Sequence, residues 1–142
     1  MPIKNATLDD LDEIHDLSVL WDEDDEKGVE FDILEDYIVT EQVLCATSDD
    51  DKIVGIIILS ENTDSSMHIA RFFVHPDYRD EGIGTDMLEQ AVSILDESCT
   101  SAFASVAETS PALRLYERFN FKKTHKFTPP TEDYIALERE PD

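Results

Sequence analysis

The sequence predicts an α/β protein, or an α+β protein with a mostly antiparallel sheet, and three observations support this fold class. Amphipathic helical patterns and β-rich runs alternate along the chain. Between residues 43 and 74, three β-rich runs follow one another with short polar turns between them, as in an antiparallel meander. The chain has 142 residues, of which 41% are hydrophobic, enough for one domain with its own core. We therefore expect a single domain that spans residues 1–142.

The N-terminal part predicts a strand over residues 3–6, followed by a helix. Thr7 suits the N-cap position, and the acidic residues after it favour the first turn of a helix. Apolar residues then recur every three positions, as on one helical face: Leu8, Leu11, Ile14, Leu17 and Leu20. The stretch WDEDDEKG, residues 21–28, breaks this period and predicts an acidic loop, and residues 31–39 return to weak helical spacing.

The middle of the chain changes from helical to strand periodicity. The β-rich runs cover residues 43–47, 52–60 and 66–74. Residues 48–51, Ser-Asp-Asp-Asp, predict a hairpin turn by composition, and residues 61–65 predict a second polar turn. Pro76 ends the third strand, because proline cannot continue a central ladder.

The second half of the chain alternates helices and strands. From Gly82 onward one helical face is apolar: Ile83, Met87, Leu88, Ala91, Val92 and Leu95. The pattern then predicts a strand, a helix with Pro111 in its first turn, and two closing strands, over residues 100–106, 110–119, 121–127 and 134–139. The whole sequence thus predicts a sheet of about seven strands and about four helices.

The charge of the chain is strongly negative and evenly spread. There are 34 acidic and 11 basic side chains, a net charge of −23, and acidic residues occur from Asp9 to Asp142. At low salt such a surface repels itself, whereas in molar salt the Debye length falls to about 3 Å and the repulsion is largely screened. We interpret the composition as that of a cytoplasmic protein of a halophile, with an ordinary acidic protein as the alternative. Because the sequence has no basic patch to displace counterions from phosphates, a nucleic-acid partner is not expected.

Other sequence features argue against secretion, membrane insertion and metal binding. Residues 1–5 lack the apolar region of a signal peptide, and the longest apolar run, residues 53–59, is too short to span a membrane. Cys45 and Cys99 lie far apart in apolar segments, which predicts reduced core residues rather than a disulfide. The 4 histidines show no metal-ligand spacing, so no metal is expected.

A glycine-containing stretch, RDEGIGTDML at residues 79–88, precedes the helix that begins near Gly82. Two glycines at a helix start allow consecutive amides to turn toward an anion, with the helix N-terminus behind them. Asp86 and the acidic pair before Gly82 should repel a phosphate, but contacts through the backbone depend little on the side chains. The stretch lacks the third glycine of a dinucleotide-binding fingerprint, so a Rossmann fold fits it badly.

A second stretch, SPALRLYERFNF at residues 110–121, places Tyr116 on a helix that leads into a strand. Together with Arg-x-x-Gly-x-Gly about thirty residues upstream, it resembles the GNAT superfamily of acetyl-CoA-dependent N-acyltransferases. The resemblance covers almost the whole chain in the right order. Its segments are IKNATLDDLDEI (residues 3–14), RFFVHPDYRDEGIGTDML (71–88), ALRLYERFNF (112–121) and DYIALERE (133–140).

The resemblance implies a binding site for acetyl-CoA as co-substrate. The main-chain amides of one loop would hold the pyrophosphate: Arg79, Asp80, Glu81, Gly82, Ile83, Gly84 and Thr85. The strand end formed by Phe72, Phe73 and Val74 would pair with the pantetheine arm, and the amide of Phe73 or Val74 would polarise the thioester carbonyl. Thr109 stands where family members often have a cofactor-contacting asparagine, so that contact is in doubt.

The resemblance also implies catalytic residues. Tyr116 would protonate the leaving CoA thiolate, and a phenol of pKa about 10 suits a thiol of pKa about 8.5. The alternative is a core tyrosine with a purely structural role. His68 lies at about the place of a glutamate that often acts as the general base, and Glu108 is its rival. A packed strand histidine is the alternative for His68.

The acceptor is expected to be a primary amine of a small molecule or a protein. Its pocket should be built from residues 21–39 and the turn at residues 61–65. The leading hypothesis is an N-acetyltransferase, the second is a non-catalytic acyl-CoA-binding sensor or partner module, and a homodimer stays open as the assembly.

Asn120 replaces the usual glycine before Phe121, and asparagine tolerates the left-handed backbone expected there.

Overall fold

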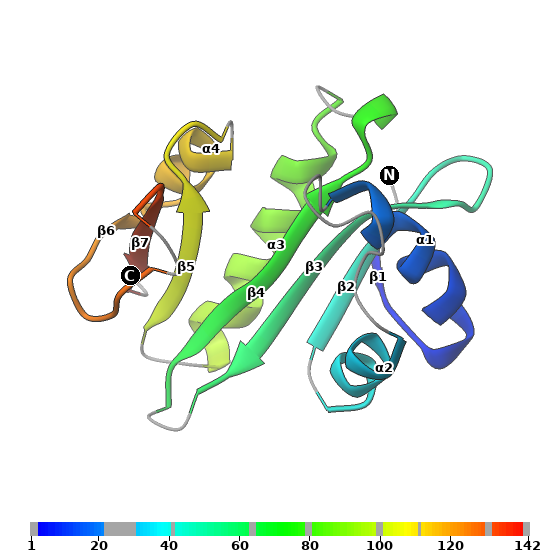
Figure 1. Cartoon of the computed structure of the whole chain (residues 1–142), viewed down its shortest axis with the longest axis horizontal. Coiled ribbons are helices and arrows are strands. Elements are labelled where there is room, and N and C mark those ends of the chain that lie inside the picture. The colour runs from blue at the N-terminus through cyan, green and yellow to red at the C-terminus, as the bar shows by residue number, and fades with distance from the viewer. Residues whose placement is uncertain are drawn as a thin grey trace. The chain divides into compact units, whose positions relative to one another are not determined.

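The computed structural model describes residues 3–21, 31–40, 42–62, 65–78, 81–98, 101–110, 112–129 and 132–140, with the side chains of Leu20, Trp21 and Phe31 left out. Within these ranges it contains seven β-strands and four α-helices (Figure 1). The strands are β1 (Ile3–Asn5), β2 (Gln42–Thr47), β3 (Ile53–Glu61), β4 (Met67–Val74), β5 (Ala102–Ala107), β6 (Lys122–Lys123) and β7 (Tyr134–Arg139). The helices are α1 (Leu11–Trp21), α2 (Phe31–Thr40), α3 (Ile83–Ser98) and α4 (Ala112–Arg118), with short 3-10 turns η1 (Leu8–Asp10) and η2 (Pro76–Tyr78).

The strands form one sheet in the order β1-β2-β3-β4-β5-β7-β6. The pairs β1–β2, β2–β3, β5–β7 and β6–β7 are antiparallel, whereas β4 and β5 run parallel. This mixed α/β architecture with a mostly antiparallel sheet confirms the predicted fold class.

The chain divides into two compact units. Unit 1 comprises Met1–Leu59 and Arg71–Leu88, and unit 2 comprises Ser60–Ala70 and Glu89–Asp142. Strand β4 and helix α3 contribute residues to both units. The expectation of a single domain stays a prediction.

In unit 1, helices α1 and α2 lie side by side (Figure 1). Thr7 is the N-cap, as predicted, but residues 8–10 form a 3-10 turn before α1 begins. Asp10 closes a capping box at this turn, since its buried carboxylate accepts the Thr7 N–H at 2.9 Å and the Lys4 ammonium at 3.1 Å. The Glu13 carboxylate accepts the Ile53 N–H at 2.9 Å and so joins α1 to β3. The buried side chains of this unit include Ile14, Leu17, Leu34, Ile56, Ile57, Ile58 and Leu59.

In unit 2, β5 alternates buried and half-buried residues, as expected for a strand with one face on the core. Strand β7 has the predicted bounds, residues 134–139. The predicted strand at residues 121–127 is wrong in length, since only Lys122 and Lys123 form β6. The Thr124 hydroxyl accepts the Lys126 N–H at 3.2 Å, and such a side-chain turn competes with strand pairing.

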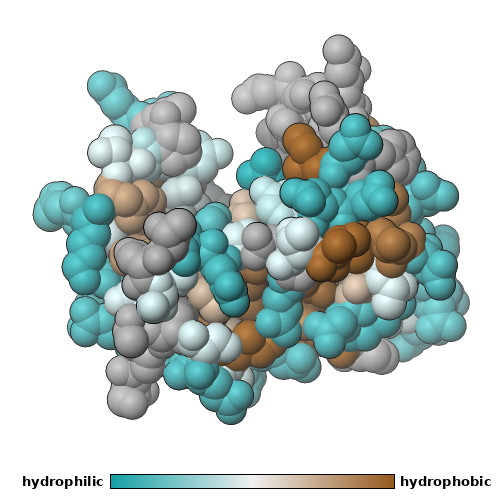
Figure 2. Space-filling model, turned by 90° about the horizontal axis from the view of Figure 1, so that it is seen from below, coloured by the Kyte–Doolittle hydropathy of each residue, from teal (hydrophilic) through white to brown (hydrophobic). Residues whose placement is uncertain are grey.

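The face of the molecule seen in Figure 2 is mainly hydrophilic. On the face seen in Figure 2, hydrophilic side chains surround smaller apolar areas. Among the described residues, the exposed large hydrophobic side chains are Leu8, Val19, Ile33, Val39 and Tyr134. No helix in the described part of the chain is both long and apolar enough to cross a membrane.

Candidate functional site

The N-terminus of α3, in unit 1, carries the predicted cofactor loop. Arg79 and Asp80 lie outside the described residues. Helix α3 begins at Ile83, and its first intrahelical hydrogen bond runs from the Asp86 N–H to the Gly82 carbonyl at 3.0 Å. The N–H groups of residues 83–85 therefore precede the intrahelical ladder, as the first amides of any α-helix do. Such amides, together with the helix dipole, favour an anion.

Gly82 is held in a left-handed conformation, with φ at 82°. A Cβ atom added there would meet no described atom within 4 Å, so the backbone conformation rather than crowding within the chain requires glycine. The same open space suits the close approach of a phosphate to the loop. The predicted glycine is therefore in place, for a reason that the sequence did not reveal.

The acidic residues of this loop are compatible with its structure. Glu81 and Asp86 are exposed, and Asp86 lies in the first turn of α3. Carboxylates at this end of a helix interact favourably with its dipole. They therefore stabilise the start of α3 even though they weaken its attraction for a phosphate.

The C-terminal end of β4 carries the predicted pantetheine-binding residues. Phe73 is buried, while Phe72 and Val74 are half-buried. Gly55 in β3 makes close packing possible there, because a Cβ at Gly55 would lie 3.4 Å from the Phe73 carbonyl oxygen and 2.7 Å from the Met87 Sδ. Sequence reasoning missed Gly55, although a glycine inside an apolar strand is itself a signal of close approach.

Tyr116, in unit 2, is a buried residue of α4. Its ring packs edge-to-face on Phe121, with centroids 5.2 Å apart. Burial raises the pKa of the Tyr116 phenol above its ordinary value, so the group stays protonated at neutral pH. A protonated phenol is what a general acid requires, and the same burial also fits the alternative of a core tyrosine.

The helix that carries Tyr116 is fixed at both ends. At its start, the Ser110 hydroxyl accepts the Ala112 N–H at 3.2 Å. At its end, the Tyr116 carbonyl accepts the N–H groups of Phe119 at 3.0 Å and Phe121 at 3.1 Å. Asn120 has φ at 67°, which confirms the predicted left-handed residue.

His68, also in unit 2, is half-buried in β4 and contacts Asn62. Its Nδ1 lies 2.7 Å from the Asn62 Oδ1, while the Asn62 Nδ2 donates to the Ser66 hydroxyl at 2.9 Å. Because the amide nitrogen is committed to Ser66, the amide oxygen must accept, and a neutral His68 then carries its proton on Nδ1. This tautomer leaves the lone pair on Nε2, which is the arrangement of a base oriented by its second nitrogen. Sequence reasoning missed the role of Asn62.

Glu108 and Thr109, the other predicted site residues of unit 2, are exposed in the turn between β5 and α4. The Glu108 N–H donates to the Asp133 carbonyl at 2.8 Å. His68 pairs with Phe103, five residues before Glu108 on the parallel strand, which separates their backbones by about 16 Å. The two base candidates therefore lie toward opposite ends of β5.

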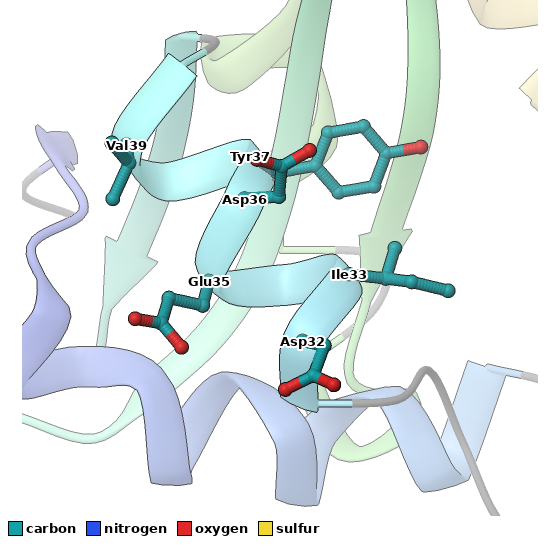
Figure 3. Close-up of a pocket in the computed structure, with 6 residues that line it drawn as sticks. All are labelled: Asp32, Ile33, Glu35, Asp36, Tyr37 and Val39. Carbon is teal, nitrogen blue, oxygen red and sulfur yellow. The ribbon is translucent and has the colours of Figure 1, made fainter.

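A cavity of about 540 Å³ lies against α2 in unit 1, within the range predicted for the acceptor pocket. The residues that line it are Asp32, Ile33, Glu35, Asp36, Tyr37 and Val39. Figure 3 shows Ile33 and Tyr37 pointing to the same side of the helix, as residues four apart do. The wall offers three carboxylates beside apolar groups. Residues 22–30 and two residues of the predicted turn, 63 and 64, lie outside the described part of the chain.

Cys45 and the histidines give no metal centre among the described residues, where no group of three or more His, Cys, Asp or Glu is placed to hold an ion. Cys45 is a free, buried thiol, as predicted, and burial raises its pKa to about 11. The thiol is therefore protonated and unreactive at neutral pH. Cys99 lies outside the described residues.

Comparison with known proteins identifies the family. A sequence model of the acetyltransferase (GNAT) family matches residues 8–121. A search of curated proteins finds no significant match.

Several solved structures share the fold. The ribosomal-protein-S18-alanine N-acetyltransferase from Escherichia coli has a TM-score of 0.79 and 16% identity, covering 98% of this chain and 92% of that one. A GNAT-family acetyltransferase from Staphylococcus aureus Mu50 has a TM-score of 0.79 and 20% identity over 99% of both chains. A point mutant of the spermidine N-acetyltransferase from Vibrio cholerae has a TM-score of 0.78 and 17% identity over 99% and 95%. With the family model matching most of its length, the chain belongs to the GNAT acetyltransferase family.

Proposed function

We propose that the protein transfers an acetyl group from acetyl-CoA to a primary amine. The observation that carries this proposal is the N-terminus of α3, where left-handed Gly82 precedes the first amides of the helix in a chain of this family. The site needs no basic side chain to bind a phosphate, so the acidic surface does not argue against it.

The residues that would hold acetyl-CoA come from the loop and strand end of unit 1. The amides from Glu81 to Thr85, with Arg79 and Asp80 before them, would bind the pyrophosphate, and Phe72 to Val74 would pair with the pantetheine arm. Thr109, in unit 2, is a further cofactor-binding residue that the family resemblance suggests. When bound, acetyl-CoA supplies an acetyl group on a thioester, whose C–S bond breaks as the amine nitrogen forms the new C–N bond.

Two proton transfers accompany this exchange. Tyr116 would give its phenolic proton to the leaving sulfur as the C–S bond breaks. Burial raises the pKa of the phenol, which keeps it protonated beforehand but also makes it a weaker acid. His68 is the base that the family resemblance suggests. It lies five residues before Phe73 on β4, about 16 Å along the strand, so it would take the amine proton through water rather than directly. Glu108 is exposed and remains the alternative base, acting directly or through water.

The acceptor we propose is a primary amine on a small molecule or a protein. Two proteins of similar fold carry such acceptors in their names, the alanine of ribosomal protein S18 and spermidine. The carboxylates of Asp32, Glu35 and Asp36 on the α2 cavity would attract an ammonium group. We further propose that the protein acts in the cytoplasm of a cell with high internal salt, where its charge is screened.

Ligand-dependent stability tests the proposed co-substrate. In molar KCl, acetyl-CoA and CoA should raise the melting temperature, while NAD should not. Thiol release should then be measured with spermidine, an alanine-terminated peptide and a lysine-containing peptide. Stabilisation without thiol release for any amine would favour the non-catalytic acyl-CoA-binding module, and no stabilisation by acetyl-CoA or CoA would refute the proposal.

A further inference from the structure

Arg139 is a buried cation in unit 2 that joins three elements. It lies in β7 with 5% of its surface exposed. Its Nε donates to Asp96 Oδ1 at 3.1 Å and its Nη2 to Asp96 Oδ2 at 2.7 Å, a two-pronged pair with the C-terminal part of α3. Its Nη1 donates to the main-chain carbonyl of Phe119, just beyond α4. A buried charge is costly unless it is paired, so these contacts define where the guanidinium sits.

The Phe119 carbonyl belongs to the turn that ends the tyrosine helix. The last carbonyls of an α-helix lack intrahelical partners and need donors from elsewhere. A cation near the helix C-terminus also interacts favourably with the dipole. Because α4 is only 7 residues long, its stability depends strongly on what holds its ends.

This turn connects directly to Tyr116. The Tyr116 carbonyl accepts the N–H groups of Phe119 and Phe121, and the Phe121 ring packs on the Tyr116 ring. A displacement of the Phe119 carbonyl would therefore also displace Tyr116, because the hydrogen-bonded turn and the ring contact with Phe121 join the two residues.

We propose that Arg139, anchored by Asp96, is a positioning residue that holds the end of α4 and thereby keeps the Tyr116 phenol in place for proton donation. The inference rests on the proposed role of Tyr116 as general acid. Arg139 does not touch the reacting atoms in this account.

A double-mutant cycle tests the coupling. Arg139→Lys keeps the charge but loses the planar guanidinium, which donates to the Asp96 carboxylate and to the Phe119 carbonyl at the same time. Well below the melting temperature, we expect kcat to fall about ten-fold with KM for acetyl-CoA within about two-fold, as for a misplaced catalytic group. In a Tyr116→Phe background the same change should alter kcat by less than about two-fold, because the group that it misplaces is gone.

The control is Lys126→Met, which removes the 2.7 Å ion pair with Glu138, the neighbour of Arg139 in β7. It should leave kcat unchanged. Where Arg139→Lys does not fold, Asp96→Asn replaces it in the cycle, since it weakens the anchor and keeps the arginine. An unchanged kcat in a folded Arg139→Lys protein, or an equal loss in both backgrounds, would overturn the inference. If Tyr116→Phe alone leaves kcat unchanged, Tyr116 is not the general acid, and the positioning role of Arg139 is refuted as well. If Tyr116→Phe lowers kcat but Arg139→Lys does not, only the positioning role is refuted.

Discussion

Units 1 and 2 carry different kinds of candidate functional residues. In unit 1 the relevant features belong to the backbone: the left-handed Gly82, the first amides of α3 and the close approach of β3 to the end of β4 at Gly55. In unit 2 they belong to side chains that hydrogen bonds and burial hold, namely Tyr116 and His68. Backbone amides can donate to a phosphate whichever side chains flank them, so unit 1 can bind one despite acidic neighbours that weaken the attraction. The proposed proton transfers depend on the identity of particular side chains, so we expect unit 2 to be more sensitive to substitution at these positions.

Removing the Tyr116 hydroxyl should have the largest effect. Tyr116→Phe keeps the ring on Phe121 and removes the proton donor, so turnover should fall about ten- to a thousand-fold, as for other general acids. The affinity for acetyl-CoA should change little, because unit 1 provides it. The control is Tyr134→Phe, which removes the hydroxyl of an exposed tyrosine in the same unit. Equal turnover in Tyr116→Phe and wild type would show that Tyr116 is structural.

Adding a methyl group at Gly55 should disturb the packing of unit 1. The new Cβ would lie 2.7 Å from the Sδ of fully buried Met87, so Gly55→Ala should cost about 1–3 kcal/mol of stability in urea unfolding at molar KCl. In a Met87→Val background the cost should shrink, because the shorter side chain leaves room. The same cost in both backgrounds would mean that Met87 is not the obstacle.

Substitutions at Gly82 separate backbone conformation from size. Gly82→Ala should weaken acetyl-CoA binding, because holding alanine in a left-handed conformation costs about 1–2 kcal/mol. Gly82→Asn is larger, yet asparagine tolerates this conformation, so it should retain more affinity in titration calorimetry. Tighter binding by the alanine variant than by the asparagine variant would show that size, not conformation, matters at this position.

The smallest effect concerns Asp10 and pH. Burial alone raises the pKa of Asp10, but hydrogen bonds from Thr7 and Lys4 outweigh it and hold the pKa below its usual value. The carboxylate therefore stabilises the fold above its unfolded pKa of about 3.9, and this contribution is lost as pH falls through the folded value. Asp10→Asn should reduce stability by about 1 kcal/mol at pH 7, as for a lost helix cap, and the difference from wild type should vanish in strong acid.

The control for Asp10 is Asp9→Asn, which changes an exposed carboxylate in the same turn. With Asp9→Asn, the free energy of unfolding should decrease at low pH in the same way as in wild type. A constant difference between Asp10→Asn and wild type at every pH would contradict the assigned cause.

Much of the fold could be predicted from local patterns. β-rich runs and the spacing of apolar residues located most of the strands and helices. Asn120 was expected to be left-handed because it replaces the family's usual glycine and because asparagine tolerates that conformation. The prediction of a strand over residues 121–127 was wrong in length, because the turn at Thr124 outweighs the strand propensity of the residues that follow. Residues 8–10 differ from the predicted helix in forming a 3-10 turn, in which the Asp10 N–H donates to the Thr7 carbonyl at 2.9 Å.

The candidate site could be predicted only where it has a local motif. Gly82 and Tyr116 stand in recognisable stretches. The ion pair of Arg139 with Asp96 joins residues 43 apart, and the contact of Gly55 with Met87 joins β3 to α3. Such contacts arise from tertiary packing, and no spacing in the sequence predicts them.

The affinity for acetyl-CoA as a function of KCl tests the central claim, that backbone groups of unit 1 bind the phosphates. Screening at about 1 M salt hides the repulsion from Glu81 and Asp86, while short main-chain hydrogen bonds survive. Affinity should therefore hold or increase as KCl rises, compared only over the range where circular dichroism shows a constant fold. Asp80→Asn with Glu81→Gln should flatten this dependence. A steep loss of affinity with rising salt in the folded protein would show that basic side chains hold the phosphates, contrary to this account.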